Sequence, residues 1–197
     1  MESNARLRDF IQSFSHLIEH AGNDEVRILA DGKNLLSALI RHDDWLPEAF
    51  AQPSVDRYQQ YLLYCDPRER FSVVSFVWAP GQTTPVHDHT VWGMVGVMRG
   101  AERCEEFELD PATARLRAIG SHHLPTGGVD LVSPRIGDIH KVSNALKDSV
   151  SISIHVYGAN IGAVKRHVYD LHTGQKKPFI SGYTSKVIPN IWDHEAE

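Results

Sequence analysis

The stretch GQTTPVHDHTVWG, residues 81–93, places two histidines one residue apart, shortly after a turn-forming glycine and proline. Alternate residues of a β-strand point to the same face, so His87 and His89 are predicted to project together. Imidazole suits Fe, Zn, Cu and Ni, and the pair could supply two ligands to a metal ion whose third ligand lies elsewhere. Solvated strands also carry such pairs, so the rest of the chain must decide between the two interpretations.

The bulk composition is that of an ordinary globular protein. The chain has 197 residues, of which 42% are hydrophobic and 23% charged, with a formal net charge of −5. We expect a single domain over residues 1–197, with a sizeable core. The cysteines, Cys65 and Cys104, are too few for a disulfide framework and lack metal-type spacing. Without a block of like charges, a signal peptide or a membrane-spanning run, we expect a cytoplasmic protein with no nucleic-acid or membrane partner.

The first third of the chain, residues 1–65, is expected to form a helical segment. Its first helix is the clearest, because apolar residues recur at three- and four-residue steps and form one stripe. A second helix is expected around residues 35–40. A third short helix is expected over residues 54–66, SVDRYQQYLLYCD, with Ser54 as its cap. The stripe of the first helix consists of Leu7, Phe10, Ile11, Phe14, Leu17 and Ile18.

From Phe71 onward the pattern changes to short β-branched and aromatic runs separated by turn residues. No helical pattern lies between these runs, which favours a β-sandwich or barrel. We therefore predict a mainly β protein in which residues 66–197 form an antiparallel barrel and a C-terminal extension. His122 and His123, in SHHLP, are interpreted as a loop and not as a second metal site, because adjacent strand residues face opposite ways.

Two spaced motifs surround the histidine pair and a third histidine. The first runs G-x5-HxH-x3-G-x6-G from Gly81, and the second runs G-x5-P-x2-G-x2-H-x3-N from Gly128. Together they resemble the two-part signature of the cupin superfamily, with one extra residue between proline and glycine in the second motif. The resemblance implies a double-stranded β-helix, or jelly-roll, barrel in which His87, His89 and His140 bind a divalent metal ion.

One departure from the cupin signature concerns the metal site. Most cupins supply a glutamate as fourth ligand where this chain has Gly93. The resemblance then implies three neutral imidazoles and no carboxylate. Such a site leaves up to three open positions, which suits a bidentate anionic substrate together with O₂.

The segment SVSISIHVYG, residues 149–158, alternates strictly and places Ser153, His155 and Tyr157 on one face. A polar strand face usually meets solvent, but in a barrel it can line a polar lumen. Given the cupin resemblance, we favour the lumen. The order of the three groups also suits a functional role. The serine hydroxyl can fix the tautomer of the imidazole, and the imidazole can in turn tune the phenol.

The three-histidine set and the S-x-H-x-Y row together resemble the cysteine dioxygenase family of thiol dioxygenases, over about Tyr58 to Tyr169. This family uses non-haem Fe(II) and O₂ to convert a thiol to its sulfinic acid. Its cysteine-specific members carry an arginine where this chain has Gln60. Its mammalian-type members carry, in place of Gly93, a cysteine linked to the tyrosine, so we predict an unmodified Tyr157.

Both departures resemble the bacterial branch that prefers 3-mercaptopropionate. In that branch an arginine nine residues after the tyrosine binds the substrate carboxylate, and Arg166 stands there. The resemblance implies that Arg166 and Gln60 anchor the carboxylate. It also implies that Tyr157, oriented by His155 and Ser153, donates a hydrogen bond during oxidation.

Alternatives remain open at this point. Three histidines and a water are equally a Zn(II) hydrolytic or hydratase site, and a cupin can also bind a small ligand without catalysis. Within the family, L-cysteine remains the second substrate. The sequence leaves open the metal that is bound, whether Arg166 points inward, and whether the protein is a monomer or a small homo-oligomer.

Overall fold

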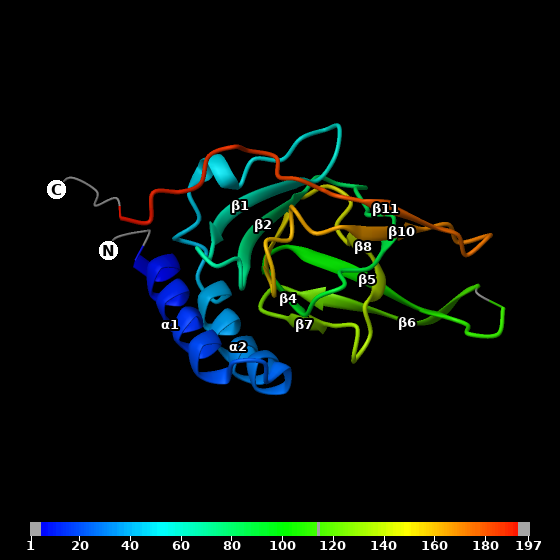
Figure 1. Cartoon of the computed structure of the whole chain (residues 1–197). Helices are drawn as coiled ribbons and strands as arrows, with labels where there is room; N and C mark the ends of the chain where they lie inside the picture. The colour runs from blue at the N-terminus through cyan, green and yellow to red at the C-terminus, as the bar shows by residue number, and fades with distance from the viewer. Residues whose placement is uncertain (1–4, 114, 193–197) are drawn as a thin grey trace.

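The computed structural model describes residues 5–113 and 115–192 of the chain. Within these residues two helices precede a body of eleven strands, arranged as two antiparallel sheets (Figure 1). The helices are α1 (Ala5–Ala21) and α2 (Glu25–Ile40), and a short 3-10 helix, Glu48–Phe50, follows them. Neither α1 nor α2 combines the length and the hydrophobicity needed to cross a membrane.

The two sheets face each other and enclose the lumen of the barrel. The predicted mainly β, jelly-roll fold with N-terminal helices is confirmed. The first sheet has the strand order β1 (Gln59–Cys65), β2 (Ser72–Trp78), β9 (Ser151–Tyr157), β4 (Gly93–Arg99) and β7 (Val129–Val132). The second has the order β11 (Lys176–Phe179), β10 (Arg166–Tyr169), β3 (Val86–His87), β8 (Ile139–Asn144), β5 (Ala101–Leu109) and β6 (Leu116–Pro125).

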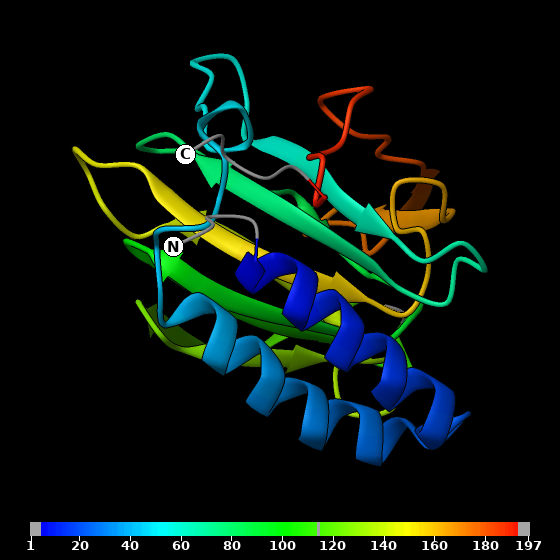
Figure 2. The ribbon, with the colours of Figure 1, turned by 90° about the vertical axis from the view of Figure 1, so that its left-hand side faces the viewer.

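The helices cover the outer face of the first sheet (Figure 2). The whole apolar stripe predicted for α1 is buried. Helix α2 begins after Asp24, whose side chain accepts a hydrogen bond from the Arg27 amide at 3.1 Å. It lies close to β4, because a Cβ on Gly32 would come within 2.4 Å of the Met94 side chain. The central strands are therefore buried on both faces.

The third helix expected over residues 54–66 is wrong. Residues 59–65 instead form strand β1, paired antiparallel with β2 at the edge of the first sheet. Burial alternates along this strand: Tyr61 and Leu63 contact the core beneath the helices, and Leu62 contacts the lumen side. Pairing with β2 and burial on two faces decide the structure here, and local propensity does not.

The interpretation of His122 and His123 as a loop is also wrong. Both lie in strand β6, opposite Cys104 and Arg103 of β5. The opposite orientation of the two side chains is fully compatible with a strand at the edge of the second sheet, where β5 and β6 pair along their length and are here called the β5–β6 ribbon. This ribbon extends to the side of the molecule away from the helices (Figure 1).

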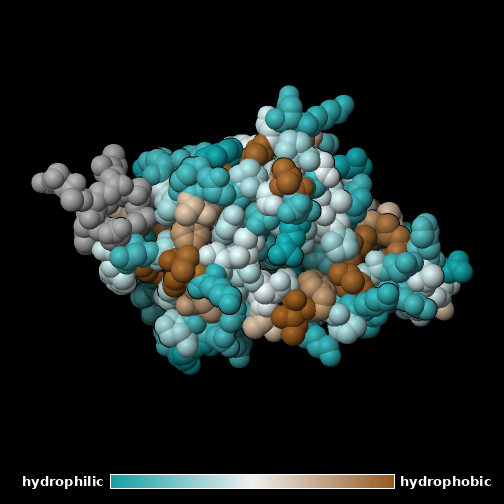
Figure 3. All heavy atoms as spheres, turned by 90° about the horizontal axis from the view of Figure 1, so that it is seen from above, coloured by the Kyte–Doolittle hydropathy of each residue, from teal (hydrophilic) through white to brown (hydrophobic). Residues whose placement is uncertain are grey.

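The C-terminal extension completes the second sheet and then returns over the first. After β11, the backbone of Gln60 bonds to Thr184 twice, through Thr184 N to Gln60 O at 2.7 Å and Gln60 N to Thr184 Oγ1 at 2.8 Å. On the face seen from above, exposed apolar side chains form separate patches among hydrophilic ones (Figure 3). Residues 181–184 of the extension also line the pocket that opens into the lumen.

Candidate metal centre

The three histidines predicted as ligands meet in the lumen. Strand β3 carries His87, directly opposite His140 on β8, and His89 follows two residues later. One nitrogen from each lies within 4.8 Å of the others, and all three residues are buried. The ring centroids are 4.8–4.9 Å apart. The geometry therefore brings together the ligand set that the spacing predicts.

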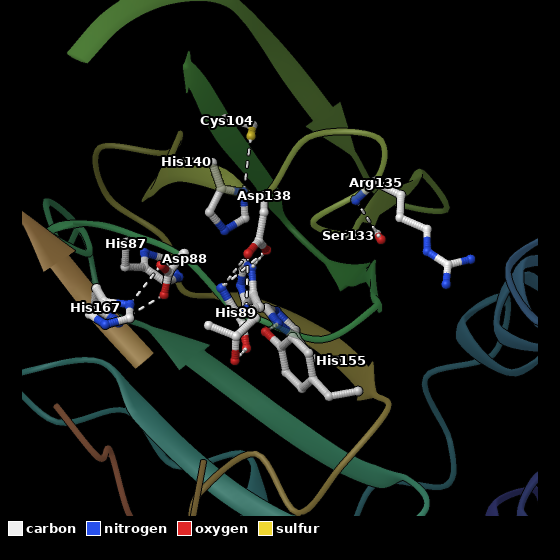
Figure 4. A network of polar contacts seen from close by, with 12 residues as sticks. His87, Asp88, His89, Cys104, Ser133, Arg135, Asp138, His140, His155 and His167 are labelled. Atoms are coloured by element: carbon white, nitrogen blue, oxygen red, sulfur yellow. Dashed lines mark hydrogen bonds and ion pairs between the residues drawn. The ribbon is translucent and has the colours of Figure 1, made fainter. Parts of the chain in front are cut away.

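The Nδ1 atom of each ring already has a partner. Figure 4 shows the partners of His89 and His140. His87 donates to the Pro85 carbonyl at 3.1 Å, and His89 donates to the Asp138 carboxylate at 2.9 Å. His140 contacts the Cys104 sulfur at 3.5 Å. Among the described residues, the buried Nε2 of His89 has no hydrogen-bond partner. The free lone pairs therefore converge, and these residues fit a divalent metal ion.

Burial also sets the protonation state that a metal ion requires. Desolvation, reinforced by the neighbouring imidazoles, lowers the pKa of His87 to about 3 and that of His140 well below its usual value. The pKa of Asp138 is lowered: burial, the largest single contribution, would raise it, but the ring and amide of His89 and the amide of Thr90 together outweigh burial. At neutral pH His87 and His140 are therefore neutral imidazoles beside a carboxylate.

Two carboxylates that support this centre are absent from the sequence prediction. Asp138 accepts the backbone N–H groups of His89 and Thr90 in addition to the imidazole. Asp88 accepts from the His167 backbone and ring and from the Tyr169 hydroxyl, which joins β3 to β10. Carboxylates commonly orient ligand histidines, so their positions beside His87, His89 and His140 were the available signal.

The glycine in place of a fourth ligand is explained by the neighbouring tyrosine. A Cβ on Gly93 would lie 2.6 Å from Cδ1 of Tyr157 and 3.0 Å from Val132. The Tyr157 ring fills this space and stacks on His89, with centroids 5.3 Å apart. No side chain fits at position 93 while the tyrosine keeps this place.

The row on β9 is continuous and faces the lumen, as expected. Ser153 Oγ lies 2.8 Å from His155 Nε2, and His155 Nδ1 lies 2.7 Å from the Tyr157 hydroxyl. Trp78 donates its indole N–H to Ser153 at 3.3 Å, which leaves the serine proton for His155. In that arrangement His155 donates to the Tyr157 oxygen, and the phenol proton is free. Burial lowers the pKa of His155 and raises that of Tyr157, so both are neutral.

The two residues predicted to bind the substrate line the same pocket. Arg166 and Gln60 border a cavity of about 290 Å³ together with His87, His140 and Tyr157. Arg166 is only 4% exposed, so it points inward. Its Nη2 donates to Ser181 at 2.7 Å, its Cζ lies 4.8 Å from the Phe179 ring centroid, and its Nε has no partner among the described residues.

A buried acid near Ser153, on the β9 row of Ser153, His155 and Tyr157, is a further residue that the sequence prediction missed. Glu102, on β5, is 1% exposed, and neither carboxyl oxygen has a hydrogen-bond partner in the described part of the chain. Burial raises its pKa to about 7, although the nearby Ser153 hydroxyl opposes this shift. With Cys104, Asp130 and His140 it lines a cavity of about 10 Å³, room for roughly one water molecule.

Comparison with known proteins finds no matching family model. Similar solved structures include a Klebsiella pneumoniae protein with a double-stranded β-helix domain, at 18% identity and TM-score 0.46, over 57% of this chain and 82% of that one. An RmlC-like cupin from Desulfovibrio desulfuricans has 25% identity and TM-score 0.41, over 59% and 93%. An oxalate oxidase with bound glycolate has 18% identity and TM-score 0.43, over 54% and 53%. The neighbours are cupin-superfamily proteins, and some are enzymes.

Proposed function

We propose that this protein is a non-haem Fe(II) thiol dioxygenase that oxidises a small carboxylate-bearing thiol to its sulfinic acid. The favoured substrate is 3-mercaptopropionate, with L-cysteine next. One observation carries the proposal: a buried three-histidine centre and a buried guanidinium border the same pocket. The reaction is RSH + O₂ → RSO₂H, in which both oxygen atoms enter the product and the thiol supplies all the electrons.

The metal centre would be held by His87, His89 and His140. Fe(II) bound there would supply a Lewis-acidic site for the thiolate and for O₂. The chain contributes the fixed orientation of two of the ligands, His87 through Pro85 and His89 through Asp138.

Arg166 would anchor the substrate carboxylate. Its guanidinium is held from one side by Ser181 and rests on the Phe179 ring, while its Nε has no hydrogen-bond partner within residues 5–113 and 115–192. A planar guanidinium binds a carboxylate through two parallel hydrogen bonds, which fixes the direction in which the thiol points. Gln60, on the wall of the same pocket, would add an amide donor. Arg166 and Gln60 therefore favour a carboxylate-bearing thiol over a neutral thiol as the substrate.

Tyr157 would donate a hydrogen bond to oxygen where negative charge develops. Its ring is fixed against His89, and its oxygen accepts from His155 when Ser153 donates to that imidazole. The phenol proton is then available to the pocket. A donor held in place before the reaction stabilises developing charge without a cost of reorganisation.

The test is O₂ uptake by protein loaded anaerobically with Fe(II), given 3-mercaptopropionate or L-cysteine, with the sulfinate quantified. We expect one O₂ consumed for each sulfinate formed and a higher kcat/KM for 3-mercaptopropionate. No uptake at full iron occupancy would overturn the proposal. Hydrolytic or hydratase activity with zinc would then support a Zn(II) cupin enzyme, and ligand binding without turnover would support a binding cupin.

The anchor has its own matched pair of variants. Arg166→Gln removes the buried charge, whereas Lys165→Gln removes the exposed charge next to it. Loss of a charge-assisted bond costs about 1.5–3 kcal/mol, so Arg166→Gln should lower kcat/KM by roughly 10- to 150-fold, mostly through KM. Lys165→Gln should leave the kinetics unchanged. Equal kinetics for the two variants would contradict the assignment of Arg166.

A further inference from the structure

A second set of metal-binding side chains lies on the β5–β6 ribbon, outside the three-histidine centre. Cys104 and Glu106 share one face of β5, and His122 lies directly opposite Cys104 on β6. One donor atom from each lies within 4.8 Å of the others, the same limit that holds for the three histidines. Thiolate, carboxylate and imidazole are the three ligand types that zinc prefers.

His122 is oriented as a ligand histidine would be. Its Nε2 lies 2.6 Å from an oxygen of Asp130, so this nitrogen donates to the carboxylate. The lone pair is then on Nδ1, 3.9 Å from Glu106 Oε1. This is the arrangement in which Asp138 holds His89, with the roles of the two ring nitrogens exchanged.

The local backbone leaves room for the Glu106 carboxylate. A Cβ on residue 120 would come within 3.0 Å of Glu106 Oε2, and the residue there is a glycine. The β5–β6 register shifts next to Glu106, between Glu106 and Phe107, so a bulge re-aims the strand at this point. The carboxylate therefore lies over the ribbon, toward Cys104 and His122.

The cluster is open to a cation from solvent. The side chain of His122 is 37% exposed and that of Glu106 48%, whereas Cys104 is buried beneath them. A cavity of about 140 Å³ is lined by Cys104, Glu106 and Asp130 and also by His140, which borders the larger pocket as well. The two carboxylates make this opening attractive to a cation.

We propose that Cys104, Glu106 and His122 bind a thiophilic divalent cation of the zinc class, with Asp130 orienting His122. A water molecule would complete a tetrahedral set, and the Cys104 thiol would release its proton to solvent as the metal–sulfur bond forms. With metal–ligand bonds of about 2.0–2.3 Å, neighbouring donor atoms lie roughly 3.5 Å apart. Rotation of the exposed Glu106 and His122 side chains is sufficient to reach this separation.

The consequence is a link between two metal sites. The Cys104 sulfur also contacts Nδ1 of His140, a ligand of the three-histidine centre. A cation bound to that sulfur would change the hydrogen-bond partner of His140 Nδ1. It would thereby alter how His140 binds a metal ion in the three-histidine centre. The inference does not depend on the thiol dioxygenase proposal, because the ribbon cluster, Cys104, Glu106 and His122, is a separate set of ligands.

The test is titration of metal-free, reduced protein with Co²⁺. The three-histidine centre contains no sulfur, so a thiolate-to-cobalt charge-transfer absorption in the near ultraviolet reports only the ribbon cluster. We expect a band that saturates once two Co²⁺ per chain have been added, since the three-histidine centre also takes up Co²⁺ without giving the band, and that disappears when Zn²⁺ is added. Zinc bound at saturation should be two per chain in the wild type and one in Cys104→Ser.

Matched variants make the outcome decisive. Cys104→Ser should abolish the band, and Cys65→Ser, at the other free cysteine, should retain it. On the ribbon surface, His122→Asn should weaken cobalt binding at least 10-fold, whereas His123→Asn should not; this pair decides the matter if Cys104→Ser does not fold. Absence of the band in the wild type, or its persistence in Cys104→Ser, would overturn the proposal. Failure of O₂ uptake alone would bear only on the dioxygenase assignment.

Discussion

The three-histidine centre and the ribbon cluster have a similar arrangement of donor atoms but differ in how far they are buried. Each has three donor atoms within 4.8 Å, and each has a histidine oriented by an aspartate. The first is buried and made of three imidazoles, whereas the second is partly exposed and contains a thiol and a carboxylate. Burial holds the ligands of the three-histidine centre in place, and exposure lets Glu106 and His122 rearrange. The comparison teaches that environment, more than ligand spacing, decides what each site can do.

The largest expected effect concerns Glu102, which lies where the two regions meet. Its pKa, near 4.5 when unfolded, is raised by burial to about 7, so ionisation of the folded protein costs stability as pH rises from about 4.5 through 7. A shift of this size corresponds to a loss on the order of 3 kcal/mol. Glu102→Gln removes the titrating group and should be free of this loss.

Urea unfolding of both proteins at pH 5 and pH 8 measures this difference. The stability of the wild type relative to Glu102→Gln should fall by that amount between the two pH values. Histidines with lowered pKa values, such as His140, are present in both proteins, so their contribution cancels. A pH-independent difference would show that Glu102 does not titrate in this range and that the interior between the sites is more polar than its burial indicates.

The next effect separates the two sites through their aspartates. Asp138→Asn removes the acceptor that fixes His89, and Asp130→Asn does the same for His122. Loss of such a partner typically lowers metal affinity by about 10- to 100-fold. Each substitution should weaken metal binding only at its own site. Fe(II) binding measures this for the three-histidine centre (the inner site), and the cobalt–thiolate band measures it for the ribbon cluster (the outer site). If Asp130→Asn weakened the inner site equally, the two would be one coupled unit.

Much of the inner site was predictable from the sequence, because its ligands stand at short, regular spacings. His87 and His89 are two residues apart on one strand, and the second motif places His140. The β9 row was predictable for the same reason, since alternation along one strand sets its face. Local periodicity therefore predicted the strands of the barrel and the face on which Tyr157 lies, whereas the three histidines were predicted from the resemblance of the two spaced motifs to the cupin signature.

The rest depended on contacts between distant strands. Cys104 and His122 meet only because β5 and β6 pair in a particular register, which short-range patterns do not specify. The same holds for residues 59–65, whose apolar residues suit either a helix or a strand until β2 pairs with them. Asp138 was missed because its role lies in a hydrogen bond across 49 positions of the sequence.

The smallest effect compares one glycine from each region. A Cβ on Gly93 would lie 2.6 Å from the Tyr157 ring, which is stacked on His89 and hydrogen-bonded to His155, so the ring cannot move freely. A Cβ on Gly120 would meet only the end of the Glu106 side chain, which can rotate into solvent. Overpacking of a fixed interior costs about 1–3 kcal/mol, so Gly93→Ala should destabilise the protein by that amount. Gly120→Ala should change stability by less than about 0.5 kcal/mol, as is usual for surface positions.

Chemical unfolding of both alanine variants, with the wild type as reference, checks this contrast. Gly93→Ala should also displace the Tyr157 ring, which ultraviolet difference absorption would register even if the stability change is small. Gly120→Ala should instead reduce cobalt binding at the ribbon cluster, because the Glu106 carboxylate must swing away from Cys104 and His122. Equal stabilities for the two variants, with an unmoved tyrosine, would mean that the lumen adapts as readily as the surface. The rigidity assigned to the inner site would then be wrong, and Gly93 would no longer be explained by the position of Tyr157.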